Sequence, residues 1–286
     1  MDAASGPAYL LVEPSHYEVS YTINPWMQPG IWAEDPAGHR REAQAAFASL
    51  TASLRDAGGT VEIADGVTRL PDMVFPANGG IVLDGRALLA RFRYPQRQGE
   101  EAAFRAVFDG LKARGRLDEV IILPDGLTQE GAGDCIWDRT RRLAWTGFGP
   151  RSSPAAPAFI AETFDIEVRR LELATERFYH LDTCFCVLPG GEVLFYPQAF
   201  SKEGNALIRD TVQADLLIEA SDEDAARFCV NAVAVGHTIV MATPADRLTR
   251  VLRERGYAVS PVPLEPFILS GGGAYCMTLR LDLRTH

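Results

Sequence analysis

The stretch that decides the fold lies near the end of the chain and reads Ser270-Gly271-Gly272-Gly273-Ala274-Tyr275-Cys276-Met277-Thr278-Leu279-Arg280-Leu281. Three consecutive glycines allow backbone conformations and close approaches that other residues exclude. The alternation of Met277, Leu279 and Leu281 is typical of a strand. A thiol at the mouth of such a loop is a candidate nucleophile, although free cysteines are often inert, buried residues. The stretch alone leaves both interpretations of Cys276 open.

The composition of the whole chain excludes several classes of protein. The chain has 286 residues, 47% hydrophobic and 23% charged, which is ordinary for a globular protein. A net charge of −10 and a pI near 5.1 argue against nucleic-acid and anionic-membrane partners. The chain contains no apolar run long enough to span a membrane, and residues 1–7 lack the pattern of a signal peptide. We therefore expect a cytoplasmic protein, and because no Gly/Ser- or Pro-rich linker interrupts the chain, we expect one domain over residues 1–286.

The five cysteines and the histidines give no sign of a disulfide framework or a metal site. An odd number of cysteines without an export signal favours reduced thiols; they are Cys135, Cys184, Cys186, Cys229 and Cys276. The histidines are scattered, and no acidic loop has the spacing of a calcium site. We expect no metal and no cofactor.

The remainder of the chain repeats a rhythm of polar loop, strand, tight turn, strand, helix and short strand every roughly fifty to sixty residues. In the first such unit, the pattern predicts strands at Ile81–Leu83 and Ala87–Ala90, a hairpin turn at Asp84-Gly85 and a helix over Glu100–Ala113. A later strand is expected over His180–Leu188. If the units surround an axis, their polar loops converge at the centre.

Four of these loops carry chemistry, at Asp72–Asn78, Glu130–Asp134, His180–Asp182 and Gly271–Cys276. Together they hold a thiol, an imidazole, several carboxylates and an amide. His180 and Asp182 are two residues apart, so on a strand their side chains share a face. This set suits nucleophilic catalysis assisted by general acid–base chemistry.

These motifs resemble the guanidine-modifying (pentein) superfamily of arginine deiminases, amidinotransferases and dimethylarginine dimethylaminohydrolases. His-x-Asp at His180–Asp182, Glu-Gly-x-Gly-Asp at Glu130–Asp134 and the terminal Gly-Gly-x-x-Cys-Met-Thr follow the family's order at about its spacing, over nearly the whole chain. The resemblance implies an α/β fold, a five-bladed α/β propeller of ββαβ units with the active site on its axis.

Within the superfamily the chain is most similar to the arginine dihydrolase branch, a module that cyanobacteria fuse to an ornithine-handling domain. The similarity is carried by Tyr21–Met27, Pro71–Phe75, Arg97–Glu101 and Arg177–Cys186. No second domain follows Cys276, so we expect any ornithine to leave. The implied catalytic residues are Cys276 as nucleophile, His180 as acid and base, and Glu130, which holds the guanidinium and orients His180. The implied substrate-binding residues are Asn24, Asp72, Asn78, Arg97, Asp134, Arg151 and Asp182.

Residue chemistry supports these roles. Carboxylates bind a guanidinium bidentately, which suits Asp72, Glu130 and Asp182, while Arg97 and Arg151 suit an α-carboxylate. Asn78 stands at or beside a position where deiminases and dimethylarginine hydrolases are expected to hold a carboxylate. An amide both donates and accepts, so it can hold a neutral ureido group for a second attack.

The expected function is conversion of L-arginine to L-ornithine, ammonia and CO2 through a covalent thiouronium intermediate. The alternatives are a deiminase or a dimethylarginine hydrolase, both giving citrulline, an amidinotransferase with an amine acceptor, and a non-catalytic arginine-binding propeller. Binding alone requires neither Cys276 nor His180, which argues against the last. The structural alternatives are a turn position for Asp72, solvated loop positions for Glu130 and Asp134, surface positions for both arginines, and a positive-φ turn at Asn78. The expected partner is a small guanidine, and a homo-oligomer is left open.

Overall fold

The computed structural model describes residues 6–286; residues 1–5, which carry part of the signal-peptide argument, lie outside the described residues. The described residues form five three-stranded sheets. In each sheet the middle strand pairs antiparallel with one neighbour and parallel with the other. The prediction of five ββαβ units is therefore confirmed.

Four of the units follow one another along the chain. The first contains β3 (Gly80–Leu83), β4 (Arg86–Leu89), α3 (Pro95–Ala113) and β5 (Glu119–Ile122). The second contains β6 (Cys135–Asp138), β7 (Leu143–Phe148), α4 (Ala156–Phe164) and β8 (Glu167–Glu172). The third contains β9 (Phe185–Val187), β10 (Val193–Phe195), α5 (Lys202–Thr211) and β11 (Leu217–Glu219). The fourth contains β12 (Val233–Val235), β13 (Thr238–Ala242), α7 (Asp246–Glu254) and β14 (Ala258–Val262).

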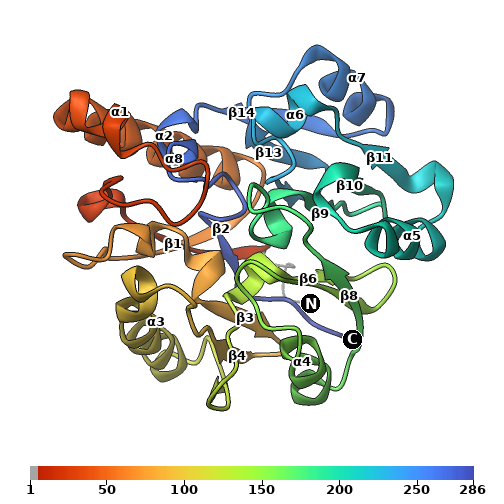
Figure 1. Ribbon diagram of the computed structural model, residues 1–286, viewed down its shortest axis with the longest axis horizontal. Helices are drawn as coiled ribbons and strands as arrows, with labels where there is room; N and C mark the ends of the chain where they lie inside the picture. Colours follow the sequence, from red (N-terminus) through yellow and green to blue (C-terminus); the bar gives the residue numbers. More distant parts are fainter. Residues whose placement is uncertain (1–5) are drawn as a thin grey trace.

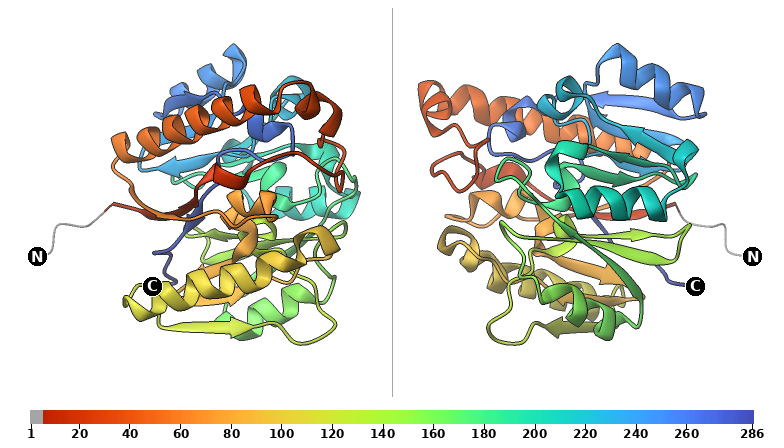
Figure 2. Two further views of the ribbon diagram at one scale, coloured as in Figure 1. Left: turned by 90° about the vertical axis from the view of Figure 1, so that its left-hand side faces the viewer. Right: turned by 45° about the vertical axis from the view of Figure 1, so that its right-hand side comes forward.

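The fifth unit joins the two ends of the chain. It contains β15 (Leu279–Arg280), β1 (Ala8–Val12), α2 (Pro36–Asp56) and β2 (Thr60–Ala64). Leu10 pairs with Leu279, and the backbone N–H of Leu281 donates to the carbonyl of Ala8 at 2.8 Å. The start of the described chain and its C-terminal strand accordingly lie side by side (Figure 2). The helices of the units line the rim, and three short helices complete the fold: α1 (Pro29–Glu34), α6 (Asp222–Ala226) and α8 (Glu265–Ile268) (Figure 1).

Local sequence signals account for many of these boundaries. Asp84 and Gly85 have φ angles of 54° and 76°, the left-handed pair that an Asp-Gly hairpin turn requires. The helix α2 begins after Asp35, whose side chain accepts from the N–H of Gly38, and has Pro36 in its first turn. In α3, Phe104, Phe108 and Leu111 form the buried face. None of the helices within residues 6–286 combines the length and apolar character that a membrane span requires.

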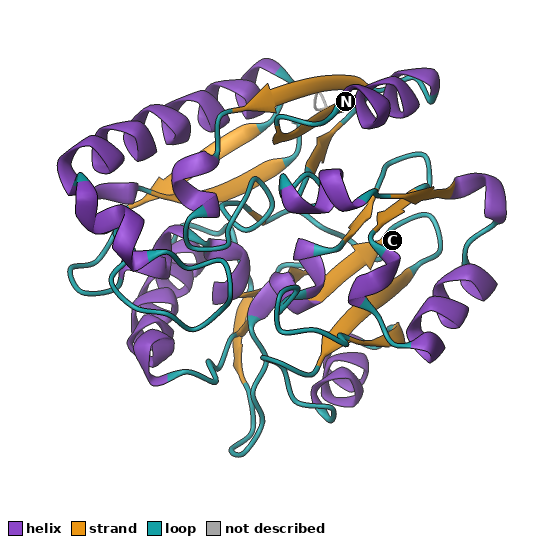
Figure 3. Ribbon diagram, turned by 45° about the horizontal axis from the view of Figure 1, so that its top comes forward, coloured by secondary structure: helices purple, strands orange, loops and turns teal. Residues whose placement is uncertain are grey.

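Short 3-10 turns stand before the first strands of three units. They are η3 (Pro76–Gly79), η4 (Gly131–Asp134) and η5 (Leu181–Thr183), and η2 (Pro71–Val74) precedes the first of them. The expected strand over His180–Leu188 is therefore wrong in its first half, because residues 181–183 are helical and the strand begins at Phe185. These turns contact one another and lie with loops in the centre of the molecule (Figure 3). They bring the polar loops together.

Candidate active site

The structure buries all ten of the predicted site residues. Their exposed fractions run from 0% for Glu130 and His180 to 7% for Asn24. This excludes the solvated-loop interpretation of the carboxylates and the surface interpretation of Arg97 and Arg151. Asn78 lies in η3 and is not among the residues with positive φ, so the turn interpretation fails as well.

Cys276 faces two polar side chains across the propeller axis. Its Sγ lies 3.1 Å from Oδ2 of Asp182 and 3.1 Å from Nδ2 of Asn231. Burial raises the pKa of the Cys276 thiol well above its ordinary value, and the charge of Asp182 raises it further. The resting sulfur is therefore a neutral thiol whose proton is donated to Asp182.

His180 is held between Glu130 and Asn78. Its Nε2 lies 2.7 Å from Oε2 of Glu130, and Nδ2 of Asn78 donates to its Nδ1 at 3.4 Å. Burial lowers the pKa of His180 to about 4, although its hydrogen bond to Glu130 opposes this shift. At neutral pH the ring is therefore neutral, with its proton on Nε2 and an unprotonated Nδ1.

Glu130 is fully engaged by protein donors. Its Oε2 also accepts from Nη1 of Arg151 at 3.0 Å, and its Oε1 accepts from the backbone N–H of Arg93 at 3.0 Å. Burial alone would raise the pKa of Glu130, but the charge of Arg151 and the bond from His180 bring it below the ordinary range. Glu130 thus orients His180 as an ionised carboxylate.

Arg97 fixes the orientation of the Asn78 amide. Its Nε and Nη2 donate to the two carboxylate oxygens of Glu100 at 2.9 and 2.7 Å, and its Nη1 donates to Oδ1 of Asn78 at 2.9 Å. Because Oδ1 faces the guanidinium of Arg97, Nδ2 must face His180. A buried chain of hydrogen bonds therefore runs from Glu100 through Arg97, Asn78 and His180 to Glu130.

Two carboxylates in the site keep an unused oxygen. Oδ2 of Asp72 accepts from the hydroxyl of Tyr21 at 2.9 Å, whereas its Oδ1 is buried without a donor. Oδ1 of Asp182 is likewise buried without a donor, and burial raises the pKa of Asp182 to about 7. Buried acceptors without donors are costly, and a guanidinium supplies several N–H donors in one plane.

The other predicted residues hold the loops together. Asn24 donates from Nδ2 to the carbonyl of Ser270 at 3.1 Å and accepts from the N–H of Trp26 at 2.8 Å. Asp134 accepts from the hydroxyl of Ser152 at 2.5 Å and from the N–H of Leu181 at 2.9 Å, which ties η4 to η5. Arg151 also donates to the carbonyl of Ile23 at 3.0 Å.

Three further residues of the site were not predicted from the sequence: Tyr21, Glu100 and Asn231. Tyr21 and Glu100 lie inside segments that carry the family resemblance, but no role was assigned to them. Asn231 precedes β12 in the fourth unit, in the loop Phe228–Asn231, which contains no charged side chain. The repeat could have pointed to Asn231, because in every other unit the loop before the first strand carries a polar residue of the site.

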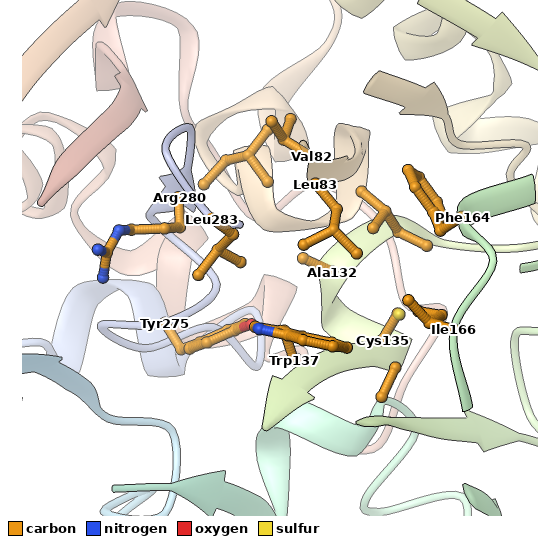
Figure 4. A pocket seen from close by; sticks show the side chains of 13 residues that line it. Val82, Leu83, Ala132, Cys135, Trp137, Phe164, Ile166, Tyr275, Arg280 and Leu283 are labelled. Carbon is orange, nitrogen blue, oxygen red and sulfur yellow. The ribbon is translucent and has the colours of Figure 1, made fainter. Parts of the chain in front are cut away.

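No group of three or more His, Cys, Asp and Glu residues in the described part of the chain is arranged to hold a metal ion. A separate small apolar cavity of about 20 Å³ lies beside Tyr275 and is also lined by Trp137, Cys135 and Leu283 (Figure 4). It has room for about one water molecule and contains none of the ten predicted residues.

Comparison with known proteins places this geometry in a family. The model of the family described as N,N dimethylarginine dimethylhydrolase, eukaryotic, matches residues 22–283. The bifunctional arginine dihydrolase/ornithine cyclodeaminase ArgZ of Synechocystis is 39% identical over 272 residues, which cover 95% of this chain but only 37% of that protein. The N(G),N(G)-dimethylarginine dimethylaminohydrolase of Mycobacterium tuberculosis is 32% identical over 273 residues, covering 96% of this chain and 85% of that protein.

Solved structures agree with these sequence relatives. The N-terminal domain of ArgZ, crystallised as a cysteine-to-serine variant with its substrate, superposes with a TM-score of 0.92 at 38% identity. The match covers 98% of this chain and 100% of that domain. A dimethylarginine dimethylaminohydrolase structure at 18% identity and a TM-score of 0.76 shares the fold. The chain therefore belongs to the N,N-dimethylarginine dimethylhydrolase family and has the pentein fold.

Proposed function

We propose that the protein is an arginine dihydrolase that converts L-arginine to L-ornithine, two ammonia and CO2 at one site. The observation that carries the proposal is Asn78, an amide fixed between Arg97 and His180 beside the thiol site. The ArgZ and AgrE relatives are named as arginine dihydrolases, and their similarity to this chain supports the same assignment.

In the first half-reaction the guanidinium of arginine binds to the unused oxygens of Asp72 and Asp182. Binding of this cation stabilises the Cys276 thiolate, which attacks the guanidino carbon. His180, which is neutral at rest, takes the thiol proton of Cys276 and passes it to the departing nitrogen, so ammonia leaves and a thiouronium adduct remains. His180 then takes a proton from water, the resulting hydroxide attacks the adduct, and the thiolate is released with citrulline as product.

In the second half-reaction the same carbon is attacked again. Citrulline is neutral, so a carboxylate in place of Asn78 would have no substrate cation to bind and could only accept from the ureido group, whereas the amide can both donate to that group and accept from it. Loss of the remaining amino group as ammonia gives a thiocarbamate on Cys276. Its hydrolysis releases a carbamate of ornithine, which loses CO2. The overall reaction consumes two water molecules.

The proposal also includes roles for the other residues that the sequence pointed to. Arg151 and Arg97 would meet the α-carboxylate, for which Arg97 must release one of its present partners. Asp134 and Asn24 would act by positioning loops. The five cysteines are all unpaired thiols, which favours a reducing compartment such as the cytoplasm. Residues 1–286 would act as one catalytic domain.

A second candidate is hydrolysis of asymmetric dimethylarginine to citrulline and dimethylamine, which the family model and the mycobacterial relative favour. A competition assay separates the two. Purified enzyme receives L-arginine and asymmetric dimethylarginine together, and mass spectrometry follows ornithine, citrulline and dimethylamine, with Cys276→Ser as the inactive control. Arginine should be consumed first and ornithine should accumulate. Preferential release of dimethylamine would reject the proposal in favour of the second candidate.

A further inference from the structure

Asn231 uses its whole hydrogen-bonding capacity around the nucleophile. Its Nδ2 donates to Sγ of Cys276 at 3.1 Å and to the carbonyl of Asp182 at 3.0 Å. Its Oδ1 accepts from the backbone N–H groups of Tyr275 at 2.9 Å and Cys276 at 3.2 Å. Two N–H groups and two lone pairs are all that an amide offers, and Asn231 is fully buried.

We propose that Asn231 is a positioning residue that fixes the Cys276 loop through Oδ1 and stabilises the sulfur as a thiolate through Nδ2. The inference rests on the proposed cysteine chemistry and deepens it. It assigns the fourth unit of the propeller a part in the site.

The two polar neighbours of the sulfur act in opposite directions. Asp182 accepts the thiol proton and so favours the neutral thiol, whereas an N–H donor favours the anion. When a guanidinium binds Oδ1 of Asp182, its positive charge makes the carboxylate a weaker acceptor for the thiol proton and favours the thiolate, and Asn231 keeps its contact with sulfur. Hydrogen bonds to ionised groups are about twice as strong as neutral ones, so this contact strengthens as the thiolate forms.

The packing around Asn231 supports a fixed position. A Cβ atom on Gly273 would lie 2.8 Å from Oδ1 of Asn231 and 2.9 Å from the ring of Phe228, so only glycine fits there. Tyr275 points into the apolar cavity of Figure 4, whereas the next residue, Cys276, faces Asp182. The backbone between these two side chains is the segment that Oδ1 holds.

The other groups that influence the thiol are few. Asp182 lies against the sulfur, and the phenols of Tyr179 and Tyr275 are near enough to interact with its charge. Burial raises the pKa of Cys276 and Asp182 raises it further, while a backbone hydrogen bond from Gly273 and the side chain of Asn231 lower it. Removal of the Asn231 donor should therefore reduce the thiolate fraction.

The test is the rate at which iodoacetamide alkylates Cys276, followed by mass spectrometry of its peptide over about pH 6 to 9. Asn231→Asp keeps an acceptor for the two backbone N–H groups and loses the donor, and Asn231→Ser has a hydroxyl too short to reach the sulfur. Both should slow alkylation by about ten-fold or more at each pH below the thiol pKa. Asn205→Asp is the matched control in α5, where Nδ2 donates to the carbonyl of Pro197; its alkylation rate should equal that of the wild type.

Circular dichroism identifies which variants are folded. A folded Asn231 variant that alkylates at the wild-type rate across the pH range overturns the inference, even if its stability is lower. A second measurement needs no variant. Alkylation of Cys276 in the wild type should shift the NMR signals of the Asn231 side-chain amide, and signals that stay at their original chemical shifts would also overturn the inference. Neither measurement requires turnover, so failure of arginine hydrolysis would reject the proposed function alone.

Discussion

Single residues decide which reaction the site performs, and Asn78 is the clearest case. It lies between the guanidinium of Arg97 and the unprotonated nitrogen of His180. In an Asn78→Asp variant, the new carboxylate would accept from Arg97, and it would accept from Nδ1 of His180 once that nitrogen is protonated. It would therefore raise the pKa of His180 and disfavour neutral citrulline. We expect ornithine formation to fall at least about ten-fold while citrulline accumulates. Chromatography of both products measures the ratio; a variant that still makes mainly ornithine contradicts the role of the amide.

The raised pKa of Asp182 determines how the stability of the protein should depend on pH. Its pKa rises from the ordinary 3.8 to about 7 in the folded protein, chiefly through burial. The unfolded chain therefore gives up this proton first, and the wild type loses stability as the pH rises from about 4 to about 7. Asp182→Asn removes that loss.

We expect the unfolding free energy of Asp182→Asn to exceed that of the wild type by an amount that grows with pH and levels off above about pH 7. The plateau should be on the order of 4 kcal/mol, while activity is lost. Urea denaturation at several pH values measures the difference. A difference that is constant with pH would argue against a raised pKa for Asp182.

At the scale of elements, the 3-10 turns place the catalytic groups. Gly133 in η4 packs against the end of the Asn78 side chain, where an added Cβ would lie 2.4 Å from Nδ2. Gly133→Ala should therefore displace the amide from His180, costing about 1–3 kcal/mol of stability and lowering kcat with arginine by about ten-fold or more.

Gly30→Ala in α1 is the matched control, because an added Cβ there meets no atom within 4 Å. This variant should keep wild-type kcat and gain up to about 1 kcal/mol of unfolding free energy. Steady-state kinetics and urea melts compare the pair. Equal kcat values for both variants would show that η4 does not position Asn78.

The same elements show where prediction from sequence reached its limit. The hairpin at Asp84-Gly85 was predicted correctly, because a local pair of residues determines it. The helix α3 begins at Pro95 rather than Glu100, so Arg97 lies in its first turn and reaches forward to Glu100. Periodicity does not reveal such a start. It also does not distinguish the η5 turn from a strand, because all three residues of η5 are buried, as they would be in a central strand. The helix α5 was not predicted.

At the scale of the whole molecule, the ring depends on a single sheet made from both ends of the chain. Leu279 in β15 is 1% exposed and pairs with Leu10. Leu279→Ala should lower the unfolding free energy by about 2–5 kcal/mol. Ile122→Ala, at a strand position that is 56% exposed, should change it by no more than about 0.5 kcal/mol. Thermal unfolding compares the two, and equal stabilities would mean that this closure contributes little.

A repeated unit of strands, turn and helix could be predicted from the rhythm of the sequence, whereas the number of five units followed from the resemblance to the guanidine-modifying superfamily. The meeting of Cys276, His180 and Asp182 followed from that architecture. Two other contacts depend on side-chain directions at the centre of the ring. They are the hydrogen bond from Asn231 to the sulfur of Cys276 and the ion pair between Arg97 and Glu100. No local pattern encodes those directions.

The most direct test of the central claim uses L-arginine labelled with ¹³C at the guanidino carbon, with ¹³C NMR and an ammonia assay followed over time. The account predicts that the label passes transiently through citrulline into bicarbonate, with two ammonia and one ornithine formed per arginine. Label that stops at citrulline with one ammonia would contradict it and make the protein a single-step guanidine hydrolase.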